Sequence, residues 1–109
     1  MNANSDGAMA RSMDSGVGGT VLRDHQGAFC AGVCHFFPSA FDLEMAELLA
    51  CRRAIQLAGE ANVQRLVLET GSQAVVSKLQ NHGTNFSVFG HFINEIKALL
   101  LSFQDGKVS

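Results

Sequence analysis

Two spacings of apolar residues alternate along the 109-residue chain. Short apolar or β-branched runs bounded by turn residues predict strands, and apolar residues three or four positions apart predict helices. We expect strands starting at Thr20 and over Ala28–Phe37 and Val63–Thr70, and helices over Ser39–Gly59, Ser72–Gln80 and Phe86–Phe103. Met1–Asn4 is too short to assign, and Lys107–Ser109 resembles the opening of a strand after a Gln104–Gly106 turn. A hairpin around Asp24–Gly27, followed by helices alternating with strands, predicts an α/β sheet with a right-handed crossover.

The Ser39–Gly59 helix places one carboxylate, Glu47, on its apolar side. At about 100° per residue, the residues on that side are Leu43, Ala50, Cys51, Ala54, Leu57 and Ala58, and those on the far side are Met45, Arg52, Gln56 and Glu60. A carboxylate within an apolar stripe is costly to bury unless it is paired or binds a cation. The alternative is a Glu47 at the rim of the stripe, on the helix surface, and periodicity does not separate the two.

Composition indicates a folded chain of one small domain, residues 1–109. Hydrophobic residues make up 47% and charged residues 17%, which is not the composition of a disordered chain. The net charge of −2 gives no overall attraction to nucleic acid, so any such binding needs a local basic patch. The apolar runs are too short to span a bilayer, and we expect no membrane association.

The three cysteines are an odd number in a chain without a secretory signal. This pattern predicts reduced thiols in an intracellular protein, without distinguishing nucleus from cytoplasm. Cys30 and Cys34 share one face of a predicted strand and His35 follows them. No second ligand pair has the spacing of a zinc site, so the pattern does not favour one.

Four segments together resemble the ribonuclease H-like domain, in particular its plant reverse-transcriptase-like branch. Their order and spacing carry the resemblance, which covers nearly the whole chain. The segments, with the family patterns in parentheses, are Asn4–Ala8 (N-x-D-G-A), Gly18–Gly27 (G-G-V-V-L-R-D-x-x-G), Ala46–Ala54 (A-E-A-L-A-x-R-x-A) and Leu68–Gln73 (a strand ending E-T/S-D-S). The resemblance implies a mixed sheet, with an antiparallel hairpin and a parallel strand, flanked by helices.

The resemblance also implies a chemistry for Glu47. Such enzymes cut the RNA strand of an RNA–DNA hybrid with two divalent ions, Mg²⁺ or Mn²⁺, about 3.5–4 Å apart and held by clustered carboxylates. By matching position, Asp6 is the first ligand and Glu47 the second. The third position, an aspartate in the family, is Gly71 here. Glycine cannot ligate, and strand alternation directs the nearest spare carboxylate, Glu69, away from the face of Thr70.

The C-terminus departs from the family as well. In the family, a strand continuing from Lys107–Ser109 leads to a helix that carries the last aspartate, with a histidine in the loop before it. The sequence stops at Ser109. We therefore expect an incomplete domain that lacks the last strand and helix, and a Phe86–Phe103 helix with exposed apolar surface for a protein partner.

These observations lead to a hypothesis about function. The chain is expected to be a nucleic-acid-binding domain of the RNA–DNA hybrid ribonuclease class, catalytically impaired, with Asp6 and Glu47 as the remaining, weakly metal-binding ligands. Ser72, Gln73 and Lys78 are candidate contacts to a nucleic-acid backbone. The alternatives are a slow nuclease and a non-catalytic protein-interaction module or remnant of the same fold.

Overall fold

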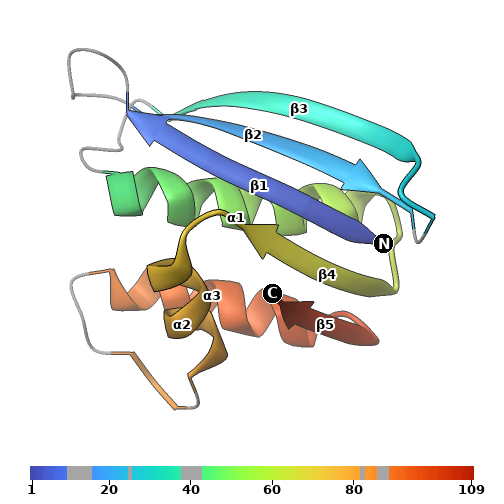
Figure 1. The fold of residues 1–109 in the computed structure, drawn as a ribbon. Coiled ribbons are helices and arrows are strands. Elements are labelled where there is room, and N and C mark those ends of the chain that lie inside the picture. The colour runs from blue at the N-terminus through green and yellow to red at the C-terminus, as the bar shows by residue number, and fades with distance from the viewer. Residues whose placement is uncertain (10–15, 25, 38–42, 82, 86–88) are drawn as a thin grey trace.

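A computed structural model describes residues 1–9, 16–24, 26–37, 43–81, 83–85 and 89–109. The strands are β1 (Asn2–Met9), β2 (Gly16–Arg23), β3 (Phe29–Phe37), β4 (Arg65–Thr70) and β5 (Asp105–Val108), and the helices are α1 (Leu43–Glu60), α2 (Gln73–Gln80) and α3 (Gly90–Leu101). Figure 1 shows α1 lying along one face of the sheet, and α2 and α3 near β4 and β5.

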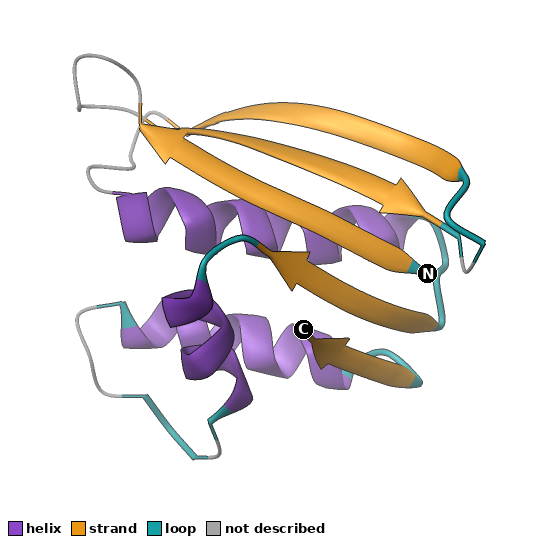
Figure 2. Cartoon of the chain, in the orientation of Figure 1, coloured by secondary structure: helices purple, strands orange, loops and turns teal. Residues whose placement is uncertain are grey.

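The strands form one mixed sheet in the order β3-β2-β1-β4-β5 (Figure 2). β1, β2 and β3 pair antiparallel, whereas β4 pairs parallel with both β1 and β5. The predicted hairpin is present between β2 and β3. In its turn the Asp24 carboxylate accepts hydrogen bonds from the backbone N–H groups of Gln26 and Ala28, each at 2.9 Å, and Gly27 has a φ of 85°. The predicted mixed sheet with flanking helices is confirmed.

Two strands differ from the sequence-based expectation. β1 was too short to assign by pattern, but it runs over eight residues because it lies between β2 and β4 and is paired on both sides. The last strand, of which only an opening at Lys107–Ser109 was expected, is present as β5. Hydrogen bonds from Asp105 N to Gln64 O (3.3 Å) and from Ser109 N to Leu68 O (2.8 Å) hold it to β4, and Asp105 and Gly106, expected in a turn, belong to the strand.

The core lies between α1 and the sheet, with α3 packed against α1. Because both pack on α1, its buried face is wider than the predicted stripe. Met45, expected on the far side, is buried, whereas Leu43, expected in the core, is 50% exposed at the first position of the helix. Glu47 is half-buried, which agrees with a position at the rim of the apolar face.

The two shorter helices complete the packing at the β4–β5 side of the sheet. The side-chain oxygen of Ser72 accepts a hydrogen bond from Val75 N and caps α2. In α3, Ile93, Ile96 and Leu100 are buried at helical spacing, as predicted. No helix in the described part of the chain is long and apolar enough to cross a membrane.

Candidate active site at the ends of β1 and β4

The strand register brings two of the predicted ligand positions together. Ser5 of β1 lies between Thr20 of β2 and Thr70 of β4. The next residue of β1, Asp6, is paired with Gly19, and Gly71 directly follows Thr70. The backbones at Asp6 and Gly71 therefore lie at the same end of adjacent parallel strands. The Asp6 side chain lies outside the described part of the structure.

Glu47 reaches this end of the sheet through its helix. Cys51, one turn after Glu47, is fully buried, and its Sγ lies 3.4 Å from the Oγ of Ser5. The Ser5 Oγ in turn donates to the carbonyl oxygen of Glu69 in β4 at 3.5 Å. Because Cys51 contacts the strand residue beside Asp6, and that residue is bonded to β4 near Gly71, the preceding turn of α1 carries Glu47 toward the same region. The structure thus brings the three elements with the predicted ligand positions together.

The Cys51 thiol is a buried, protonated group. Burial raises its pKa, and the negative charge of Glu47 acts in the same direction, whereas hydrogen bonds from Ser5 and Thr70 partly oppose the rise in pKa. A thiol in this state is a poor nucleophile at neutral pH. Its role in the site is therefore to make hydrogen bonds and to pack.

A row of hydroxyl groups crosses the sheet beneath this turn of α1. Its members are Thr20, Ser5 and Thr70, which are aligned by the strand register. Thr20 is buried, and its Oγ1 has no hydrogen-bond partner in the described part of the chain. Sequence reasoning did not identify this row or Cys51. The sequence did contain a signal. Ser5 and Thr20 each stand two residues from a buried apolar residue of the same strand, Ala3 and Leu22 respectively, so their side chains face the core as well.

A cavity of about 490 Å³ opens at this end of the sheet. It is lined by Asn4, Ser5, Gly19, Val21, Glu69, Thr70 and Gly71. Gly71 is exposed, and a Cβ atom placed on it would meet no atom within 4 Å. The cavity therefore has room for a side chain at the position where the family pattern has its third carboxylate.

Glu69 lines the same cavity as Gly71. Its Oε1 accepts a hydrogen bond from the Nδ2 of Asn2 in β1 at 3.2 Å, so this carboxylate already has a partner. Among the described residues, no group of three His, Cys, Asp or Glu side chains is placed to hold a metal ion. Of the two predicted ligand side chains, Glu47 is described and half-buried, and that of Asp6 lies outside the described residues.

The predicted nucleic-acid contacts lie on and before α2. The Ser72 side chain is engaged in capping, and Gln73 is exposed. Lys78 forms an ion pair with Glu44 at the start of α1, so its charge is partly compensated. The structure does not bring these three residues to the cavity lining beside Gly71.

The arginines of α1 are also paired. Arg52 lies 3.4 Å from a carboxylate oxygen of Glu95 and 5.5 Å from the centre of the Phe92 ring. Arg53 lies 3.2 Å from a carboxylate oxygen of Glu60. Both arginines are thus paired with carboxylates of the chain itself. His82 and His25 lie outside the described residues.

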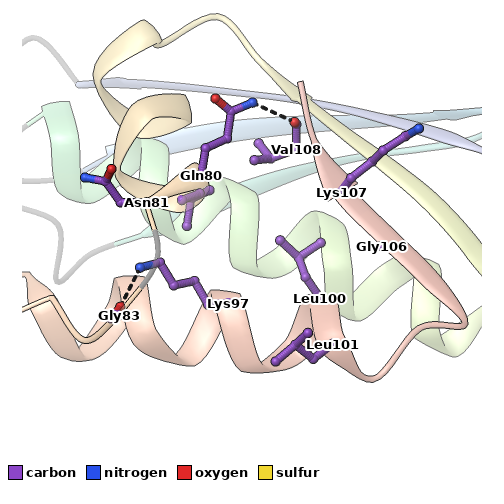
Figure 3. Close-up of a pocket in the computed structure, with 10 residues that line it drawn as sticks. Gln80, Asn81, Gly83, Lys97, Leu100, Leu101, Gly106, Lys107 and Val108 are labelled. Carbon is purple, nitrogen blue, oxygen red and sulfur yellow. Dashed lines mark hydrogen bonds between the residues drawn. The ribbon is translucent and has the colours of Figure 1, made fainter.

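A second cavity, of about 520 Å³, lies between α2, α3 and β5. Figure 3 shows Gln80 donating a hydrogen bond to the carbonyl of Val108 and Lys97 donating one to the carbonyl of Gly83. Leu100 and Leu101 line it as well, and Leu101 is 85% exposed. This cavity contains none of the predicted ligand positions.

A family model described as reverse transcriptase-like matches residues 4–109, which is nearly the whole chain. The chain belongs to the reverse transcriptase-like family. No protein of curated function matches this chain.

Solved structures show the fold of this reverse transcriptase-like chain. The RNase H1 of the halophilic archaeon Halobacterium salinarum NRC-1 is 23% identical with a TM-score of 0.88, and the match covers 99% of this chain and 82% of that one. LC11-RNase H1 in complex with an RNA/DNA hybrid is 14% identical with a TM-score of 0.82, at the same coverage. A foamy viral protease-reverse transcriptase in complex with dsDNA is 18% identical with a TM-score of 0.78, covering 99% and 78%. The fold is thus ribonuclease H-like, as the sequence motifs predicted.

Proposed function

We propose that this chain is a nucleic-acid-binding domain of the RNA–DNA hybrid ribonuclease class whose hydrolytic activity is impaired. The observation that carries the proposal is the proximity of three elements. Asp6 of β1 and Gly71 after β4 lie side by side in the register, and the turn of α1 after Glu47 contacts β1 through Cys51 and Ser5. This proximity supports a site of the ribonuclease H kind in which one carboxylate position is a glycine.

Family membership supports nucleic acid as the partner. Of the structures similar in fold, one holds an RNA/DNA hybrid and another holds dsDNA. Since the chain carries a net charge of −2 and its described arginines and Lys78 are compensated or solvated, we expect weak, salt-sensitive binding. The hybrid is proposed as the preferred duplex because the motifs are those of ribonuclease H.

Metal binding is proposed to be weak. In the ribonuclease H class, divalent ions activate water and stabilise the leaving oxygen. Here the proposed ligands for Mg²⁺ or Mn²⁺ are the carboxylates of Asp6 and Glu47, and Gly71 contributes none. We assign no hydrolytic step to these residues, because Gly71 leaves the third position without a carboxylate and hard divalent ions depend on clustered carboxylates.

The test is cleavage of a labelled RNA–DNA hybrid in Mg²⁺ and in Mn²⁺. The parent is expected to be inactive and Gly71→Asp to gain activity, because the cavity has space for the new side chain. Glu47→Ala added to Gly71→Asp should abolish the gain. Gly59→Asp is a matched control, since it adds the same charge at another glycine with open surroundings, near the end of α1. It should remain inactive.

The outcomes separate the hypotheses. Cleavage by the parent that is lost in Glu47→Ala would show that the site still works and that the proposed impairment is wrong. Folded but inactive protein in every variant, with hybrid bound more tightly than double-stranded DNA, would support a binding function alone. No binding above background at physiological salt would contradict the nucleic-acid proposal.

That last outcome would favour a protein-interaction module, the second candidate function. The observation in its favour is the 85% exposure of Leu101 at the end of α3, beside the cavity of Figure 3. Apolar surface of this kind can dock a partner. Intracellular location, plant origin and the extent of the domain stay predictions from the sequence.

A further inference from the structure

The three elements of the proposed site meet at one side chain, that of Cys51. Glu47 precedes Cys51 by four residues on α1, which is one helical turn. The hydroxyl of Ser5, the residue before Asp6, lies 3.4 Å from the thiol and donates to the carbonyl oxygen of Glu69, two residues before Gly71, at 3.5 Å. The thiol and this hydroxyl therefore connect α1, β1 and β4 close to each predicted ligand position.

We propose that Cys51 is a positioning residue that fixes the Glu47 turn of α1 against the ends of β1 and β4. The proposal rests on the proposed function for the role of Glu47. Beyond that function, it identifies the side chain that determines the position of the Glu47 carboxylate relative to the two strands.

The packing around Cys51 explains why a directional contact is needed here. The neighbouring residues on this side of α1 include Ala50, Ala54 and Ala58, which are fully buried. Alanine side chains let helix and sheet approach closely, but they interdigitate little and so resist sliding or rotation of the helix weakly. Hydrogen bonds have a preferred direction and length, so the Cys51–Ser5 contact, which the Ser5 hydroxyl continues to the Glu69 carbonyl of β4, selects one position of the helix.

The sulfur is suited to this role by its reach. An alanine would keep the close approach of α1 to the sheet and lose the contact with Ser5. A serine would keep a group that can bond Ser5, although its oxygen lies closer to the helix than sulfur does. The pair Cys51→Ala and Cys51→Ser therefore separates the loss of hydrogen bonding from the loss of the sulfur itself.

The first test is amide hydrogen exchange followed by NMR, without metal. In Cys51→Ala we expect exchange to accelerate about tenfold more at Glu47–Cys51, Ser5 and Thr70 than at the amides of α3. Cys51→Ser should restore most of the protection. The control is Ile55→Val, which removes a buried methyl group from the same helix away from the two strand ends and should accelerate exchange without this local excess.

A second variant keeps the test decisive if Cys51→Ala does not fold. Ser5→Ala removes the bond from the β1 side and should give the same local excess around Glu47–Cys51. The proposal is wrong if Cys51→Ala and Ile55→Val show the same pattern. It is also wrong if Cys51→Ser exchanges as fast as Cys51→Ala, because packing by sulfur would then be the sole contribution.

The third measurement is binding of Mn²⁺ alone, by electron paramagnetic resonance, in the Gly71→Asp background. In this background, Cys51→Ala is expected to weaken Mn²⁺ binding about tenfold, as loss of an outer-shell contact does. Cys51→Ser is expected to bind Mn²⁺ within about twofold of the affinity of the Gly71→Asp protein. If Gly71→Asp itself binds no Mn²⁺, the proposed function is contradicted, while the exchange measurement still decides the role of Cys51. Equal Mn²⁺ affinity in Cys51→Ala and Gly71→Asp would overturn the positioning role.

Discussion

The Sγ of Cys51 lies 3.4 Å from the Oγ of Ser5, and this contact joins residues 46 positions apart in the sequence. Both side chains are buried, and either atom can be the donor. Because α1 is otherwise joined to this part of the sheet through apolar packing, the contact is a specific link between the helix and the central strand of the site.

The link predicts that the two residues are energetically coupled. In a double-mutant cycle of Ser5→Ala and Cys51→Ala, the double variant should lose less stability than the sum of the single variants, by about 0.5–1 kcal/mol. Urea denaturation of the four proteins measures this difference. A cycle of Ser5→Ala with Ile55→Val is the control and should be additive within the error. Additivity in the first cycle would contradict the hydrogen bond.

The unpartnered hydroxyl of Thr20 predicts a stabilising substitution. Thr20→Val keeps the shape of the side chain and removes a buried oxygen that has no partner among the described residues. We expect the free energy of unfolding to rise by about 1 kcal/mol. Thr70→Val is the matched comparison. It removes a hydroxyl that accepts a hydrogen bond from Ser72 N at 3.3 Å, so it should lower stability by a similar amount. Destabilisation by Thr20→Val would show that its hydroxyl is satisfied.

The raised pKa of Cys51 predicts a loss of stability at high pH. Above the ordinary pKa value of 9.0, the thiol of the unfolded chain loses its proton while the buried thiol keeps it. The thiol therefore makes its full contribution to the free energy of unfolding below pH 9.0. Between pH 9.0 and the folded-state pKa, that contribution falls by about 1.4 kcal/mol per pH unit. Denaturant titrations of the parent and of Cys51→Ser between pH 7 and 11 measure the difference. Parallel curves for the two proteins would contradict the raised pKa.

Close approach at Gly106 predicts a site that tolerates no side chain. A Cβ atom there would lie 2.4 Å from the carbonyl oxygen of Leu100, which is backbone and cannot move independently. Gly106→Ala should lower the free energy of unfolding by about 1–3 kcal/mol. Gly59→Ala, in α1 with nothing within 4 Å, should raise it by about 0.5 kcal/mol. The melting temperatures of the two variants should move in opposite directions, and equal shifts would show that β5 adjusts its position.

The ion pair of Lys78 with Glu44 predicts an effect on nucleic-acid binding. Glu44→Gln leaves the Lys78 ammonium uncompensated, so affinity for an RNA–DNA hybrid should increase and the slope of log K against log salt should steepen by about 0.9. Glu60→Gln makes the same charge change at the partner of Arg53, at the far end of α1. If both variants bind equally tightly, net charge explains the gain and Lys78 is not a specific contact.

Apolar periodicity in the sequence predicted the helices, but it did not predict the strands that depend on pairing with distant parts of the chain. Most of α1 and α2 and the buried face of α3 follow from apolar spacing, and the β2–β3 hairpin follows from the turn at Asp24–Gly27. By contrast, β1 is extended because it pairs with β2 along its whole length and with β4 over Asn2–Ser5, and Asp105 and Gly106 join β5 by pairing with β4. No local pattern records these pairings. The burial of Met45 was missed because periodicity within one helix does not record which other elements cover it.

The candidate site was predicted in part. Motif spacing identified Asp6, Glu47 and Gly71, and the register places the backbones of Asp6 and Gly71 at one sheet end. The role of Cys51 was not foreseen, because it depends on which hydroxyl groups of two distant strands face the helix. The pairing of Lys78 with Glu44 was not foreseen either, because the two residues lie 34 positions apart.

The parallel pairing of β1 with β4 also determines when the site can form during synthesis. Strands β1, β2 and β3 can pair as they emerge from the ribosome, and α1 can then cover them. Thr70 and Gly71, which form one wall of the cavity, are synthesised only with and after β4. This strand pairs with β1, which is synthesised before β2, β3 and α1. Contacts of such long sequence separation form late. A ribosome stalled just after α1 would thus carry a nascent chain without this site, and a few tens of further residues would complete it.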